Sequence, residues 1–188
     1  MNTERLIKSL TAHADLSPQL ITNLEKKLKE EYYKTHQILH AAGQQENRIY
    51  FLEKGLMRNY YYDHHGNEHT VRFWEADDLF FSCQGYYAVP SYFYTEIMEA
   101  STLITLSYTS LHELDSKYSE VATLIKNMLL RHQQEEYEIQ RLIDLPPEER
   151  YITLRTKKPN IFKKAPARII ASYLHLTRET LTRYIGRN

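Results

Sequence analysis

The sequence predicts an α+β protein whose N-terminal part is an antiparallel β-roll of jelly-roll type with flanking helices. Three observations support this. Residues 1–31 show helical periodicity, residues 32–110 hold short β-rich segments separated by single glycines, and residues 119–143 carry one long helical pattern. We expect three parts: a sensor-like domain over residues 1–118, a dimerisation helix over 119–145, and a small helical domain over 146–188.

The composition is that of a folded protein. Of 188 residues, 42% are hydrophobic and 26% are charged. No apolar run approaches the ~18–20 residues that span a bilayer. The first residues also lack the apolar core of a signal peptide, so we expect no membrane contact and a cytoplasmic location. The single cysteine, Cys83, excludes an intrachain disulfide, a cysteine-ligated iron–sulfur cluster and a zinc site built on several cysteines.

Helices are expected within residues 1–31. Ser17 followed by Pro18 is typical of a helix start, because serine caps the first turn and proline suits the first helical position. Apolar residues recur at helical spacing in two sets, which are Leu6, Ile7 and Leu10, then Leu20, Ile21, Leu24 and Leu28.

The β-roll is expected between these helices and the long helix. Runs of β-branched and aromatic residues predict strands over residues 48–53, 56–62, 68–74 and 103–108. The second and third strands flank a hairpin loop, where Gly66 can adopt the positive φ that a tight turn needs. Several short strands with such turns favour an antiparallel sandwich or roll.

The long helix over residues 119–143 has apolar positions in alternating three- and four-residue steps, as in a coiled-coil seam. We expect this seam to pair with a second copy of the chain. The alternative is a helix that lies on the core of its own domain. The predicted interface consists of Val121, Ile125, Met128, His132, Ile139 and Leu142, with Glu135 as a further polar position.

Prolines punctuate the chain after the long helix. Pro146 and Pro147 are expected to end it, since proline cannot continue a helix. Three short helices are then expected, over residues 148–154 (ended by Pro159), 167–174 and 177–185.

The zero net charge conceals a polarity along the chain. Residues 148–188 hold ten basic and three acidic side chains, and therefore carry a charge of +7 against −7 for the first 147 residues. A basic tail on an acidic body suggests contact with a polyanion. The alternative is a solvated surface that happens to be basic.

Residues 167–185 predict a helix–turn–helix. Ala171 is small where two helices must cross closely, Leu176 fills the turn, and Thr177 caps the second helix. The alternative is an ordinary helical hairpin with a charged surface. The apolar anchors are Ile170, Leu174, Leu181 and Ile185, and the residues expected to point outward are Arg178, Glu179, Thr182 and Arg183.

At these residues the chain resembles the Crp-Fnr family of bacterial transcription regulators. The similar pieces are Phe-Leu-Glu-Lys-Gly-Leu-Met-Arg at 51–58, Glu-Arg-Tyr at 149–151, Ile-Ala-Ser-Tyr-Leu at 170–174 and Thr-Arg-Glu-Thr-Leu-Thr-Arg at 177–183. The resemblance implies a cyclic-nucleotide-binding-like roll and a homodimer formed through the long helix. It also implies double-stranded DNA as partner, with RNA polymerase as a further candidate.

The resemblance places Arg178, Glu179 and Arg183 at positions that contact base edges. Guanidinium groups donate to guanine O6 and N7, and a carboxylate accepts from cytosine N4. Contacts to the DNA backbone are expected from Thr177, Thr182, Lys163 and Lys164.

The sequence departs from the family's pattern at two places. His175 stands where the turn usually has glycine, so we expect a histidine with positive φ. The sequence stops at Asn188, so the β-hairpin wing common in the family is expected to be missing or truncated.

We do not expect a cyclic nucleotide in the roll. No Lys or Arg occurs between Arg72 and Lys117, and Asp77 and Asp78 would repel a phosphate. An unknown small-molecule effector is expected instead, and no cofactor. The candidate pocket residues are Tyr86, Tyr87, Tyr92, Phe93 and Tyr94, for which the alternative is packing in a core or an interface.

The sequence leaves two other functions open. His64, His65 and His69, with Glu68, could make the roll a cupin-like metal-binding protein, although hairpin tips are usually solvated and we expect no metal. The chain could also be a protein-interaction module without DNA binding. No nucleophile–base pair or phosphate-binding glycine loop indicates an enzyme. Cys83 is expected to be structural, because no basic residue lies near it in sequence.

Overall fold

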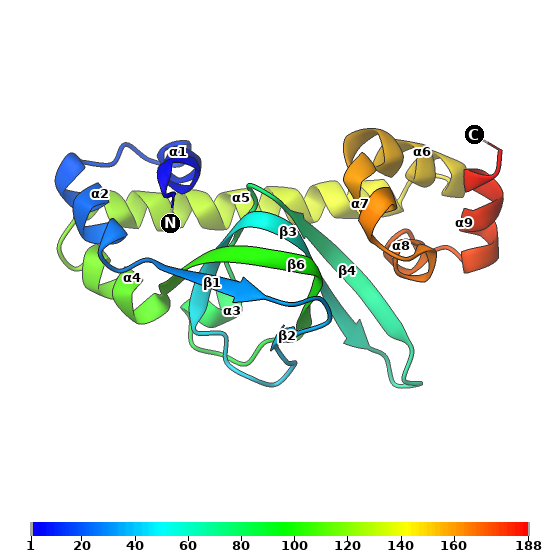
Figure 1. Ribbon diagram of the computed structural model, residues 1–188, viewed down its shortest axis with the longest axis horizontal. Helices are drawn as coiled ribbons and strands as arrows, with labels where there is room; N and C mark the ends of the chain where they lie inside the picture. Colours follow the sequence, from blue (N-terminus) through cyan, green and yellow to red (C-terminus); the bar gives the residue numbers. More distant parts are fainter. Residues whose placement is uncertain (1, 188) are drawn as a thin grey trace.

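A computed structural model of the chain describes residues 2–187. The long helix α5 (Ser119–Ile143) runs along the molecule, and a β-sheet lies against its middle (Figure 1). One end carries α1 (Glu4–Thr11), α2 (Pro18–Glu25) and α4 (Tyr108–Asp115). The other end carries α6 (Pro147–Lys157), α7 (Pro159–Lys164), α8 (Ala167–Tyr173) and α9 (Arg178–Ile185). The predicted α+β class is confirmed.

The sheet is antiparallel throughout. Its order is β1–β6–β3–β4, with β2 also on β6 and β5 also on β3. The strands are β1 (Lys29–Tyr33), β2 (Ile38–His40), β3 (Arg48–Tyr62), β4 (Glu68–Glu75), β5 (Leu79–Phe80) and β6 (Tyr94–Ser107), and the short helix α3 (Cys83–Tyr86) follows β5.

The strands predicted over 48–53 and 56–62 are one strand, β3. It bends at Gly55, where the register with β6 shifts and φ is +121°. A Cβ at Gly55 would lie only 2.9 Å from the Cα of Ser101 on β6. The glycine therefore lets one strand curve into the roll where its sequence suggested a break. The hairpin glycine, Gly66, has the expected positive φ of +80°.

The helix start predicted at Ser17 and Pro18 is confirmed, whereas the role predicted for Pro159 is incomplete. The Ser17 hydroxyl accepts a hydrogen bond from the Leu20 amide (3.3 Å) and Pro18 begins α2, as predicted. Pro159 begins α7 instead of only ending a helix, which agrees with the preference of proline for the first helical position. The N-terminal helical region also ends early, because Lys29–Tyr33 pairs with β6 as an edge strand.

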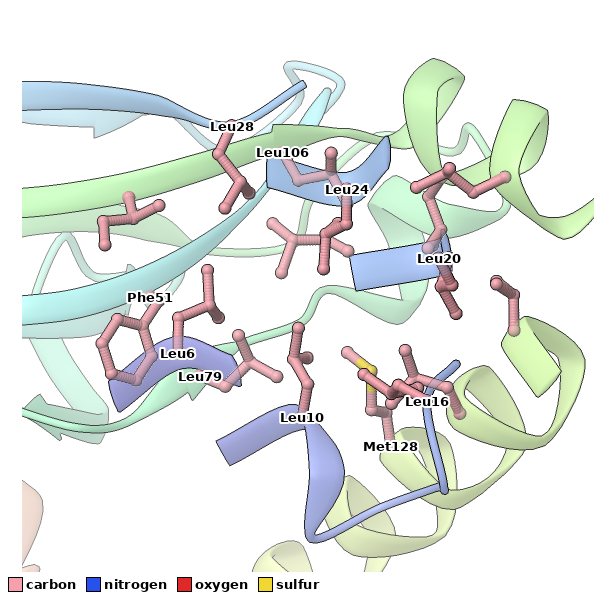
Figure 2. A pocket seen from close by; sticks show the side chains of 16 residues that line it. Leu6, Leu10, Leu16, Leu20, Leu24, Leu28, Phe51, Leu79, Leu106 and Met128 are labelled. Carbon is pink, nitrogen blue, oxygen red and sulfur yellow. The ribbon is translucent and has the colours of Figure 1, made fainter. Parts of the chain in front are cut away.

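Three buried clusters hold the elements together. The first joins α1, α2, α4 and α5 to the sheet; the second lies between the C-terminal helices and the roll; the third fills the interior of the roll. Within the first cluster, Leu6, Leu10, Leu20, Leu24 and other apolar side chains surround a small void of about 30 Å³ (Figure 2). None of the helices in residues 2–187 has both the length and the apolar character needed to cross a bilayer.

The predicted dimer seam on α5 is wrong for its first half. Val121, Ile125 and Met128 are at most 4% exposed and belong to the first cluster of their own chain. Heptad spacing predicts that a face is buried, but it does not say which chain buries it. The bounds of α5 nevertheless match the predicted residues 119–143.

The second half of the seam also faces its own chain. The Arg72 guanidinium donates to Nδ1 of His132 (3.3 Å). Burial, together with the nearby Arg72 charge, lowers the pKa of His132. Ile139 and Leu142 are half-buried and line a cavity that also borders β4 and α8.

Candidate nucleic-acid interface

The turn between α8 and α9 is a Schellman motif. The His175 amide donates to the Ser172 carbonyl (3.1 Å), and the Leu176 amide donates to the Ala171 carbonyl (2.9 Å). This places His175 in the left-handed region with φ of +52°, as expected for a residue that replaces glycine. The Thr177 hydroxyl then accepts from the Thr180 amide (3.1 Å) and caps α9.

The apolar side of the pair is packed tightly. Ile170, Ala171, Leu174 and Leu181 are at most 2% exposed. The expectation for Ile185 is wrong, since it is 41% exposed. Tyr184 takes the anchoring place, because a residue three positions after Leu181 lies on the same helix face.

The opposite side of α9 is exposed at Arg178, Glu179, Thr182 and Arg183. Within residues 2–187, no hydrogen bond or ion pair engages the side chains of Arg178 and Glu179. The Arg183 guanidinium lies 5.6 Å from the centre of the Tyr184 ring. The Thr182 hydroxyl donates to the Arg178 carbonyl (2.9 Å) and is thus directed back to its own helix. Two arginines and one glutamate therefore remain available to an external partner.

The two lysines on α7 differ. Lys163 is exposed and has no ion-pair partner among the described residues. Lys164 Nζ lies 2.6 Å from Glu99 Oε2 on β6, so this lysine joins the helical domain to the roll. The sequence could not reveal this pairing, because the partners lie 65 positions apart.

The helix–turn–helix is docked on strand β4 through α8. The Thr70 amide donates to the Ser172 hydroxyl (2.9 Å), which donates to the Glu68 carbonyl (3.1 Å). Arg168 pairs with Glu68 at 3.0 Å. The ring of Phe73 meets that of Tyr173 edge-on at 5.1 Å.

The docking contact continues into the roll as an ion-pair network. Glu68 also pairs with Arg58 (2.7 Å), which is 2% exposed and pairs with Glu96 (2.5 Å). These charges hold the pKa of Glu68 below its ordinary value, against the opposing effect of burial. The position of α8 is thus linked to charges inside the roll.

Solved structures share this arrangement. FixK2 from Bradyrhizobium japonicum is similar with a TM-score of 0.74 and 19% identity, over 85% of this chain and 83% of that one. A protein from Eubacterium rectale assigned to the Crp/Fnr family of transcriptional regulators is similar with a TM-score of 0.69 and 16% identity, over 92% of this chain and 83% of that one. CLP from Xanthomonas campestris, described as a c-di-GMP responsive global regulator, is similar with a TM-score of 0.67 and 12% identity, over 91% of each chain.

The chain has the Crp-Fnr fold. The identities are low, so they establish the fold and not the ligand or the DNA sequence. No protein-family model and no curated protein matches the sequence.

Side chains fill the interior of this Crp-Fnr-like roll. The Trp74 indole donates to the Asn59 carbonyl oxygen, and the Asn59 amide donates to the Thr95 hydroxyl (2.7 Å). A buried pair, His40 Nδ1 and Glu46 Oε2, lies 2.5 Å apart beside this cluster. The apolar filling consists of Tyr50, Leu52, Met57, Trp74, Phe80, Ile97 and Leu103.

The five aromatic residues predicted to form an effector pocket do not share one. Tyr86 lies beside His112 (5.0 Å between ring centres), and with Tyr87 it borders a groove along α5. The other three, Tyr92, Phe93 and Tyr94, cluster at the β3–β4 hairpin, where Phe93 lies 6.4 Å from Tyr61 and Tyr94 lies 5.1 Å from Tyr60. Proximity in sequence was the only basis for grouping them.

His69 and Glu68, two members of the candidate metal group, have other partners. His69 Nε2 lies 2.9 Å from Asp63 Oδ2, and Glu68 is held by Arg58 and Arg168. No group of three or more metal-binding side chains occurs within residues 2–187. Cys83 is half-buried, and burial raises the pKa of its thiol.

Proposed function

We propose that the protein is a dimeric transcriptional regulator that binds DNA through α9. The observation that carries this proposal is the free face of α9, where Arg178, Glu179 and Arg183 project from a capped helix. The similarity to Crp/Fnr-family structures supports this proposal, and the same similarity favours a regulator over an enzyme. The basic charge of residues 148–188 suits a polyanion.

In this proposal α9 enters the major groove. Arg178 and Arg183 donate to guanine edges, and Glu179 accepts from cytosine N4. Lys163 and Thr177 are exposed on the same domain and meet phosphates. Thr182 joins them when its hydroxyl turns away from the Arg178 carbonyl. Lys164 joins them only if its pair with Glu99 opens.

We also propose a second copy of the chain as partner, on a different face of α5 from the one the sequence suggested. Leu130 and Tyr137 are 47% and 62% exposed. With Gln133 between them, they are spaced by a three-residue and then a four-residue step, so the three lie on one stripe of the helix. A groove of about 350 Å³ bounded by Tyr87 and Leu129 adjoins this stripe and offers it further apolar surface. Isologous pairing along the stripe would give the two α9 helices a common two-fold axis.

Selection of bound sequences from a random duplex pool tests the function. We expect enrichment of a near-palindrome whose half-sites lie roughly 34 Å apart, one helical turn. Lys34→Glu, a charge change on the β1–β2 loop, is the control and should enrich the same site. Retention of DNA without any enriched sequence would contradict the proposal, and absence of binding at low salt would favour an interaction module.

A further inference from the structure

A cavity of about 280 Å³ lies where the roll, α5 and the helix–turn–helix domain meet. Strand β4, α5, α6 and α8 each contribute to its wall. Ligand sites often occur between domains, and this volume is close to the lower end of small-molecule pockets (~300 Å³). Trp74 borders both this cavity and the filled interior of the roll.

One part of the wall is aromatic and aliphatic. Phe73 and Trp74 come from β4, Ile139 and Leu142 from α5, and Leu154 from α6. These side chains can hold an apolar body, as most small-molecule pockets do.

The remaining wall is charged, and within residues 2–187 Lys157 is the one cation in it without an ion-pair partner. Arg72 already has partners within the chain, because it pairs with Glu135 and Glu136 and its guanidinium lies 4.0 Å over the Trp74 ring. Arg131 donates to the same Glu135 (2.7 Å). The acidic groups that line the cavity are Asp78, Glu135 and the exposed Glu138, and the lining cations are Arg72, Arg131, Lys157 and Lys158. Two further carboxylates, Glu75 and Glu136, pair with Lys158 and Arg72 from beside the cavity.

Two lysines of α6 and its C-terminus are the cations that a ligand can use. Lys157 is exposed and has no ion-pair partner within residues 2–187. Lys158 Nζ lies 3.5 Å from Glu75 and 4.0 Å from Asp78, so its pairs are loose. Burial raises the pKa of Asp78, against the opposing effect of the Lys158 charge.

Tyr173 supplies a hydroxyl without an internal partner. Its side chain is 6% exposed and lines the cavity, yet its hydroxyl makes no hydrogen bond to any described residue. Burial raises the pKa of Tyr173 to about 12, so the group stays protonated and can donate. The hydroxyl is therefore open to the cavity, where a ligand or water can accept its hydrogen bond.

We propose that this cavity binds a small organic monocarboxylate with an aromatic or branched aliphatic body, of the size of phenylacetate. The body lies against Phe73, Trp74 and Leu154, and the carboxylate meets Lys157 and Lys158. Such a ligand contacts both domains and stabilises their docked arrangement. Its effect on DNA affinity rests on the proposed function, but its binding does not.

Calorimetry on the full chain tests the site with phenylacetate and its neutral amide as probes. We expect phenylacetate to bind and the amide to bind about tenfold more weakly, because it lacks the charge-assisted contact. Lys157→Ala should weaken phenylacetate binding by a similar factor, and Ile139→Trp should abolish it by filling the cavity. Lys34→Ala, on the β1–β2 loop and away from the cavity, should bind like the parent.

Three results would overturn the proposal. These are no binding of phenylacetate, benzoate or isovalerate at millimolar concentration; equal binding of acid and amide; or binding that Ile139→Trp and Lys157→Ala leave unchanged. Thermal melts show that each variant is folded. Tyr173→Phe gives a second measurement, since it removes only the hydroxyl and should weaken binding without closing the cavity. If DNA binding fails while phenylacetate binds, only the proposed function is wrong.

Discussion

His175 adopts a conformation that costs an L-residue about 1–2 kcal/mol, because its Cβ approaches the backbone. Glycine would remove this cost but lose about 0.5–1 kcal/mol through the greater freedom of the unfolded chain. We therefore predict that His175→Gly raises the free energy of unfolding by about 0.5–1 kcal/mol, and that His175→Val lowers it. Urea denaturation measures both. A glycine variant less stable than the parent would mean that the imidazole makes a contact the turn needs.

His132 gives the fold a defined acid sensitivity. Its Nδ1 accepts a hydrogen bond from Arg72, which only the neutral ring can do, and Glu135 and Glu136, one turn further along α5, pair with the same arginine. Burial and the Arg72 charge lower the pKa of His132 in the folded chain. The unfolded chain therefore binds the proton more tightly, and the stabilisation is present above pH ~6.5 and is lost as the pH falls.

We predict that His132→Gln reduces the loss of stability between pH 7 and pH 5. The reduction can reach about 1.4 kcal/mol per pH unit at most, the limit for one proton. His13 and His175 also have lowered pKa values and should keep part of the dependence. Melting temperatures of parent and variant, measured from pH 7 to pH 5, report this loss of stability. If the two proteins lose the same number of degrees over this range, His132 does not have the role proposed for it.

At the scale of elements, the contact of α8 with β4 fixes the helix–turn–helix to the roll. Ser172→Ala would leave the amide of Thr70, which is 1% exposed, without its acceptor. We predict a loss of about 1–3 kcal/mol in stability, the cost of an unsatisfied buried donor. Ser116→Ala is the control, because that hydroxyl is exposed and bonds only a local carbonyl. Equal melting curves for the two variants would show that α8 is not held by this contact.

The exposed stripe of α5 that holds Leu130 and Tyr137 is predicted to form the dimer interface. Tyr137→Glu and Leu130→Glu place charges on the apolar positions proposed to meet a second copy, and should convert a dimer to a monomer in sedimentation at micromolar concentration. Lys34→Glu, remote from α5, should leave the mass unchanged. A parent protein that is already monomeric, or a Tyr137→Glu variant that stays dimeric, would contradict this choice of face.

Elements with local signals were predictable from sequence, and those set by distant contacts were not. The Ser17 cap, the Gly66 turn and the length of α5 depend on residues within a few positions. Strand β1 was missed because its Lys-Glu-Glu-Tyr-Tyr sequence shows no apolar alternation, and pairing with β6 decides its structure. The face of α9 was predictable because capping and apolar spacing orient a helix locally, whereas the engagement of Lys164 by Glu99 was not.

At the scale of the whole molecule, a basic helical domain is docked on an acidic roll through ion pairs and a shared apolar cluster. Lys158, Lys164 and Arg168 each meet a carboxylate of the roll. DNA phosphates would compete with these carboxylates for the same cations. The cavity between the domains could only be found from the fold, because four separate elements form its wall.

Paired variants in a binding-site selection test most directly whether α9 contacts base edges. Arg178→Ala should cost about 1–3 kcal/mol and relax the preference at one base position in each half-site. Lys163→Ala should weaken binding to all sequences alike and reduce the salt dependence, because it removes a phosphate contact. If both variants lose affinity equally across random sequences and both select the parental site, α9 belongs to a nonspecific basic surface and the claim is wrong.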